Sequence, residues 1–130
     1  MSAETNLQVL LKSMNPILHE GEYVFCTLRK TDAIDPNDLV MTFSETEGTT
    51  IILRKDIADN LNLKYDFVAA WITLTVHSSL EAVGLTAAFA TALSQKGISC
   101  NVVSGYYHDH LFVSVKNAER AMEALNSISG

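Results

Sequence analysis

Ala70-Trp-Ile-Thr-Leu-Thr-Val-His77 opens the stretch that decides the fold, because its residues alternate between two faces as they do in a β-strand. A turn containing Gly84 follows, then an amphipathic helix over residues 85–96, which Gly97 ends in a left-handed conformation. Two more predicted strands complete the stretch, which ends at Val115. This order of elements favours a module that binds a small ligand with its backbone over one that performs chemistry.

The other elements are predicted from apolar spacing and from runs of β-branched and aromatic residues. In chain order they are a helix over residues 5–14, strands over 22–28, 39–43 and 49–53, a short helix over 55–63 with Leu61 on its buried side, a strand over 65–77 and a final helix capped by Asn117. Counted together, these elements give αβββαβ and βαββα, two similar halves that meet at the strand around Trp71. Compared with a βαββαβ unit, the first half lacks an opening strand and the carboxyl-terminal half a closing strand, and each can take its missing strand from the other.

Composition and charge exclude several classes of partner. The formal net charge of −6 and the scattered Lys and Arg residues argue against a surface that binds nucleic acid. The amino terminus has no signal-peptide pattern, and no apolar run reaches the roughly 20 residues of a membrane helix, so a cytoplasmic location is expected.

Cys26 and Cys100 stand far apart in apolar runs and are predicted to be buried free thiols.

The sequence offers little that resembles catalytic chemistry. His108-Asp109-His110 places two imidazoles on one strand face, where they can hold a metal, but a metal site needs about three protein ligands and no other motif supplies the third. A polar hairpin turn, with Tyr106 and Tyr107 packed beside it, is the favoured interpretation. Ser78-Ser79 lacks the glycines of a nucleophile elbow. We therefore expect no enzyme activity, no cofactor and no metal.

Three segments of the sequence share the pattern of a known family. Leu74-Thr-Val-His-Ser-Ser-Leu-Glu-Ala-Val-Gly84-Leu85 gives a strand and a glycine turn into a helix, residues 93–103 give a Gly-Ile pair opening a strand, and Asp109-His-Leu-Phe-Val-Ser-Val115 gives a Phe-Val strand. The pattern resembles an ACT domain over most of residues 70–128. Residues 103–113 are also similar to small bacterial proteins of tandem ACT type and to CASTOR-type amino-acid sensors, and residues 43–53 fit a divergent first domain.

The resemblance implies a fold and a division of the chain. The expected fold is α+β, with two ferredoxin-like βαββαβ halves packed together and antiparallel sheets covered by helices. Residues 1–66 would form the divergent ACT-like half and residues 67–130 the ACT domain. ACT domains usually bind a free amino acid or a similar small metabolite between domains, so the resemblance implies a regulatory sensor that forms a homodimer or a higher homo-oligomer.

The resemblance also implies where such a ligand binds. Unpaired backbone N–H groups at the start of a helix attract a carboxylate, and a glycine there allows a ligand to approach closely. The expected site comprises Ser79, Leu80, Val83, Gly84 and Leu85 on the turn, Asn101, Val102 and Val103 on the adjacent strand, and Glu45, Thr49 and Thr50 from the first half. The alternative function is a protein–protein association module, in which side chains fill the same space and no ligand binds.

Overall fold

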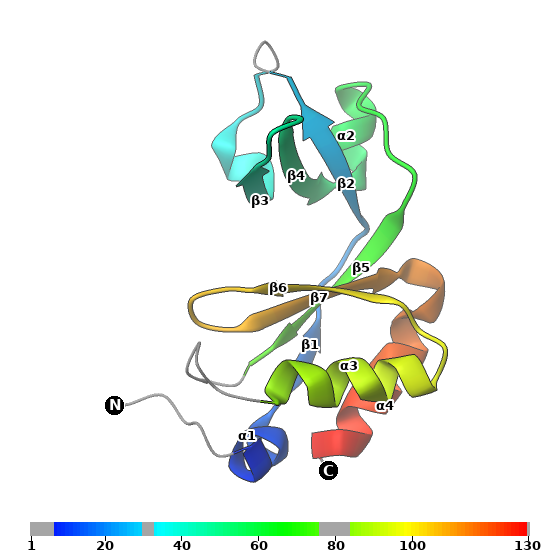
Figure 1. The fold of residues 1–130 in the computed structure, drawn as a ribbon. Helices are drawn as coiled ribbons and strands as arrows, with labels where there is room; N and C mark the ends of the chain where they lie inside the picture. Colours follow the sequence, from blue (N-terminus) through cyan, green and yellow to red (C-terminus); the bar gives the residue numbers. More distant parts are fainter. Residues whose placement is uncertain (1–6, 30–32, 76–83, 130) are drawn as a thin grey trace. The chain divides into compact units, whose positions relative to one another are not determined.

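The computed structural model describes residues 7–29, 33–75 and 84–129 (Figure 1). In chain order, the elements are α1 (Leu7–Ser13), β1 (Pro16–Leu18), β2 (Tyr23–Leu28), η1 (Pro36–Asp38), β3 (Leu39–Ser44), β4 (Thr49–Arg54), α2 (Lys55–Asn60), β5 (Val68–Leu74), α3 (Leu85–Gln95), β6 (Cys100–Ser104), β7 (Asp109–Ser114), η2 (Val115–Asn117) and α4 (Ala118–Ser129). They belong to two compact units. Residues 20–69 form the inserted unit, and residues 1–19 with 70–130 form the flanking unit.

The inserted unit is built on β4, which lies between β3 and β2 in an antiparallel sheet. β2 also pairs with Val68 and Ala69, the first two residues of β5. Helix α2 follows β4 directly and packs against β4 and β2. Because strand residues alternate between faces, every second residue enters the core. The buried core residues of this unit are Val24, Cys26, Ile51, Leu53 and Ala58.

The flanking unit has a sheet in the order β1, β5, β7, β6, with helices α1, α3 and α4 packed together beside it (Figure 1). Its first strand, β1, comes from the other end of the chain and pairs antiparallel with β5, so that Ile17 lies opposite Thr73. The element order βαββα thus gains its missing strand from the amino-terminal segment. The buried core residues are Met14, Ala70, Ile72, Leu74, Leu85, Phe89, Leu93, Ile98, Leu111, Val113, Ala121, Ala124 and Leu125.

Helix α3 follows its sequence pattern closely. Leu85, Phe89 and Leu93 are its buried residues, at the i, i+4, i+8 spacing of one helix face. At its carboxyl end the Gly97 N–H donates to the Ser94 carbonyl at 2.9 Å, and the Ile98 N–H donates to the Leu93 carbonyl at 3.0 Å. These two bonds make a Schellman motif, in which the positive φ of Gly97, +72°, ends the helix.

Two local predictions differ from the structure. β5 begins at Val68 instead of residue 65, because the chain before it turns through Asn62, whose φ is +57°. The same turn ends α2 at Asn60, leaving Leu61 44% exposed, and Leu63 packs against the core instead. α4 begins at Ala118, directly after Asn117, which is the last residue of the 3-10 turn η2 and accepts a hydrogen bond from Arg120 at 3.2 Å.

Candidate functional site

Gly84 stands at the predicted start of helix α3. Gly84 is left-handed, with φ +92° and ψ −12°, and stands immediately before the eleven residues of α3. Its carbonyl accepts the first helical hydrogen bond, from the Ala88 N–H at 2.9 Å. No side chain of a described residue caps the first turn of α3. Leu85 is in the core, so only its backbone is available to a ligand. The predicted site residues Ser79, Leu80 and Val83 lie outside the described residues.

The predicted strand residues lie on β6, in the same unit as the Gly84 turn. Asn101, Val102 and Val103 pair with residues of β7, and the Asn101 amide donates to the Phe112 carbonyl at 3.4 Å. β6 is an edge strand, so on its other side its backbone has no strand partner among the described residues. Open backbone groups of this kind can bind a ligand's ammonium group or another strand.

The three site residues predicted from the first half are brought together in the inserted unit. Glu45 begins the turn between β3 and β4, and Thr49 and Thr50 are the first two residues of β4. The Thr50 hydroxyl donates a hydrogen bond to the Glu45 carboxylate across this hairpin. Thr50 also contributes to a shallow cavity of about 440 Å³, lined with Phe25, Cys26, Thr27, Lys64, Tyr65 and Asp66.

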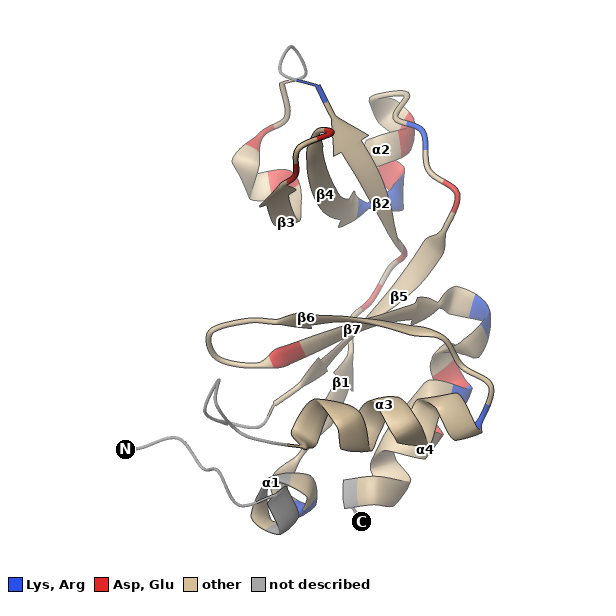
Figure 2. Ribbon diagram, viewed as in Figure 1, with Lys and Arg blue, Asp and Glu red and all other residues tan. Residues whose placement is uncertain are grey.

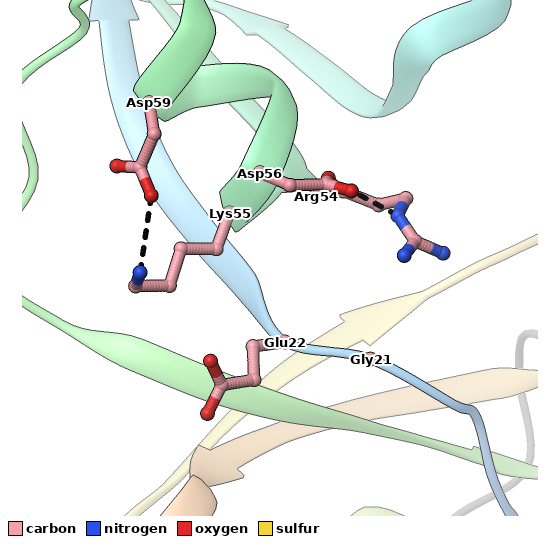
Figure 3. A pocket seen from close by; sticks show the side chains of 6 residues that line it. All are labelled: Gly21, Glu22, Arg54, Lys55, Asp56 and Asp59. Carbon is pink, nitrogen blue, oxygen red and sulfur yellow. Dashed lines mark hydrogen bonds and ion pairs between the residues drawn. The ribbon is translucent and has the colours of Figure 1, made fainter.

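A second cavity of the inserted unit, which sequence reasoning missed, is lined almost entirely by charged side chains (Figure 3). It measures about 250 Å³ and contains two ion pairs, Arg54–Asp56 at 3.3 Å and Lys55–Asp59 at 3.0 Å. Both pairs lie within residues 54–59 at the start of α2, where Figure 2 shows basic and acidic residues together, and this close spacing of opposite charges was the signal that could have located the cavity. The fifth charged side chain, Glu22, comes from the residue just before β2 (Figure 3).

The charges in this cavity largely satisfy one another. Hydrogen bonding to Arg54 lowers the pKa of the Asp56 carboxyl. The Asp59 carboxylate accepts hydrogen bonds from the Tyr65 hydroxyl, at 2.6 Å, and from Lys55, and both bonds lower its pKa. The side chains of Arg54, Asp56 and Asp59 are exposed and that of Lys55 is half-buried, and pairs in such positions contribute little to stability. Both cations that line the cavity are therefore paired, and no described lining residue offers a charged ligand an unpaired cation.

A cluster of imidazole, indole and hydroxyl groups lies on the flanking-unit sheet, on the face opposite the helices. His19 Nε2 is 2.7 Å from the Thr73 hydroxyl, which is in turn 3.0 Å from His110 Nδ1. The Trp71 indole N–H donates to the same His110 Nδ1 at 3.1 Å. The His19 ring stacks on the Trp71 ring with centroids 3.7 Å apart, and the Phe112 ring stacks on the Trp71 ring with centroids 6.1 Å apart. The alternation of residues 70–77 predicts Trp71 and Thr73 on this face, but nothing in the sequence indicated His19.

The two histidines of His108-Asp109-His110 lie in different environments. His110 points into the Trp71 cluster, whereas Nδ1 of His108 is buried without a hydrogen-bond partner in the part of the chain that the structure describes. Tyr106 and Tyr107 contact each other edge to face but are 77% and 69% exposed. Within residues 7–29, 33–75 and 84–129, no three His, Cys, Asp or Glu side chains gather as a metal site requires.

Both cysteines are free thiols, and burial raises the pKa of each. Because the thiolate is the reactive species, we expect Cys26 and Cys100 to react more slowly than free cysteine with an aromatic disulfide reagent at neutral pH. Reaction should become rapid once the protein is unfolded in denaturant. Absorbance of the released thiolate measures both rates. A fast phase in the folded protein would contradict this prediction and identify an activated thiol.

Antiparallel sheets with helices packed on them, in the order of two ferredoxin-like halves, define the fold class as α+β. The ACT domain family matches the chain twice, at residues 2–70 and at residues 67–127. The chain therefore belongs to the ACT domain family. No helix of the described residues is long and apolar enough to cross a membrane.

Solved structures share this fold. A protein of unknown function from Vibrio cholerae, described as a possible transport protein, is 46% identical with a TM-score of 0.82, covering 95% of this chain and 96% of its own. A protein from Agrobacterium tumefaciens is 18% identical, with a TM-score of 0.67 and 89% of each chain covered. The ligand-free regulatory subunit of aspartate kinase from Thermus thermophilus is 10% identical, with a TM-score of 0.65, covering 91% of this chain and 97% of its own. No functionally curated protein matches.

Proposed function

We propose that this chain is a regulatory sensor that binds a free amino acid or a similar small metabolite and has no catalytic activity of its own. The observation that carries the proposal is the left-handed Gly84, which leads into α3 without a side-chain cap among the described residues. Membership of the ACT domain family supports the same function, because such domains usually bind small ligands and regulate. The regulatory subunit of Thermus thermophilus aspartate kinase, which has this fold, is also consistent with it.

The proposed binding site follows from the charges of a free amino acid. The carboxylate would bind the N–H groups at the start of α3, where unpaired donors and the helix dipole both favour an anion. Gly84 has no Cβ, so the ligand can approach its backbone. The ammonium group would bind carbonyl oxygens at the edge of β6, near Asn101, Val102 and Val103. Ser79, Leu80 and Val83, from the segment before Gly84, and Glu45, Thr49 and Thr50, from the first half, remain proposed contributors.

A thermal-shift screen against the twenty amino acids tests the proposal. A ligand that binds only the folded state at ten times its Kd stabilises that state by about 1.4 kcal/mol, which raises the melting temperature by several degrees. We expect at least one amino acid to produce such a shift. Gly84→Trp should abolish the shift, because the indole fills the proposed site.

Gly97→Trp is the matched control for this screen. Gly97 also has a positive φ, and no atom lies within 4 Å of the Cβ that a substitution would add. The two variants thus suffer similar backbone strain, but only Gly84→Trp blocks the turn. Flat melting curves for all amino acids at millimolar concentration would contradict an amino-acid sensor. They would favour the association module, for which the edge strand β6 is a surface that can pair with a second chain.

A further inference from the structure

The hydrogen-bond donors in the Trp71 cluster determine which atoms carry protons. An indole N–H can only donate, so His110 Nδ1 must accept from Trp71, and the ring proton of neutral His110 lies on Nε2. The Thr73 hydroxyl has one hydrogen, which it can donate to His110 Nδ1 while its oxygen accepts from His19 Nε2. When His110 is neutral, the Trp71 N–H and the Thr73 hydroxyl share the one lone pair of Nδ1, and no donor in the cluster faces another donor.

Protonation of His110 on Nδ1 removes one hydrogen bond of this cluster, the one that Trp71 donates to His110. A proton on Nδ1 turns the acceptor into a donor, which then faces the indole N–H of Trp71. The Thr73 hydroxyl can rotate and accept from the imidazolium, because its oxygen has two lone pairs. Trp71 cannot reverse its role. His19 behaves differently, since its Nε2–H can donate to Thr73 in either charge state and its imidazolium ring would lie on the indole face.

The cluster joins the two chain segments that lead into and out of the inserted unit. His19 is the last residue before that unit, and Trp71 is the second residue after it. Their backbones are also linked, because the His19 N–H donates to the Trp71 carbonyl at 2.9 Å. A movement of the Trp71 side chain therefore takes place beside the hydrogen bonds that pair β1 with β5.

We propose that His19, Trp71, Thr73 and His110 form an acid-sensitive latch, in which protonation of His110 releases the Trp71 indole. The charged and titratable groups around His110 come from three segments. His19 faces it from the end of β1, His108 from the turn before β7, and Asp109 from β7 itself. On the remaining side, His110 Nε2 lies beside Gly105, where an added Cβ would be 3.3 Å away.

The pKa directions agree with this geometry. Burial lowers the pKa of His110 most, the positive charges of His108 and His19 lower it further, and Asp109 opposes them. Burial also lowers the pKa of His19. A histidine with a lowered pKa in the folded state binds fewer protons there than in the unfolded chain. The lowered pKa of His110 therefore makes the folded protein more stable at neutral pH than in acid. This stabilisation is lost as the pH falls below 6.5, the ordinary pKa of histidine.

The sequence contains one tryptophan, so the fluorescence of Trp71 reports on the latch directly. His19 stacks on the indole and affects its emission when charged, so the titration uses His19→Gln, which keeps a group near the position of Nε2. We expect the emission of this variant to titrate in one step when the pH is lowered from about 8 to about 5, with the midpoint below the ordinary histidine value. Adding His110→Asn keeps an acceptor near the position of Nδ1 but removes the titrating group, so the step should disappear.

Three results would overturn the latch. One is a step that survives when His110→Asn is added to His19→Gln, and another is a His19→Gln protein whose emission does not change over this range. The third is a step that coincides with loss of the far-ultraviolet circular dichroism, because the indole would then be reporting unfolding. Melting temperature gives an independent readout. Trp71→Phe removes the donor that conflicts with imidazolium, so its melting temperature should fall less than that of the native protein between about pH 7 and about pH 5.

Discussion

Phe89→Ala is expected to lower the free energy of unfolding by about 3–5 kcal/mol, the usual cost of truncating a fully buried phenylalanine. Phe89 is 0% exposed and lies on the face of α3 that enters the core of the flanking unit. Its ring belongs to the same buried core as Ile72 and Leu111, which lie on strands whose backbone cannot move easily to fill a cavity. Urea denaturation followed by circular dichroism measures the loss.

Phe43→Ala is the matched control, because it removes the same atoms from a side chain that is 63% exposed on β3. Substitutions at such surface positions usually change stability by less than about 0.5 kcal/mol. Equal losses for Phe43→Ala and Phe89→Ala would contradict the assignment of the core. A large loss for Phe43→Ala that depends on protein concentration would instead show that β3 is covered in an oligomer.

The second large effect concerns a fragment that begins at residue 67. The proposed carboxyl-terminal half, 67–130, lacks α1 and β1, although Met14 is part of the core and β1 pairs with β5. The fragment would leave an edge of β5 unpaired and apolar core residues in water, and a chain of this length is only marginally able to fold alone. We expect it to melt without a cooperative transition in calorimetry.

A fusion of residues 1–19 to residues 70–130 through a short Gly/Ser linker supplies the missing elements. The junction is feasible because the His19 N–H and the Trp71 carbonyl are hydrogen-bonded in the folded protein. This fusion should regain a cooperative transition and the native circular dichroism. If the 67–130 fragment instead melted at the same temperature as the fusion, the division at residues 66 and 67 would describe an independent domain and β1 would be dispensable.

Much of the fold could be predicted because local patterns and tertiary packing agree. Helix α3 is an example, since Leu85, Phe89 and Leu93 repeat at helical spacing and Gly97 ends the element. The length of β5 could not be predicted in the same way. Tyr65 continues the apolar pattern of the strand, but its hydroxyl binds Asp59, so the chain before Val68 follows α2 and does not pair as a strand.

The two sites differ in how far apart their residues lie in the sequence, and this decides whether the sequence could predict them. The position of Gly84 is local, because the sequence predicts a glycine immediately before a helix and the structure has it there. The Trp71 cluster is not local, because His19 and His110 lie 54 and 37 residues from Thr73 and meet only through strand pairing. Whether the Gly84 turn binds an amino acid stays a prediction, because the chemistry expected there depends on backbone groups that any residue carries.

The insertion of residues 20–69 between β1 and most of its partner strand has a consequence for synthesis on the ribosome. The inserted unit has all its strands once residue 69 has emerged, whereas β1 must wait for β5. At about 5–20 residues per second, the roughly fifty residues between them take about 3–10 s to make. During that time the nascent chain presents α1 and β1 without their partners, so these elements are made before the inserted unit but buried after it.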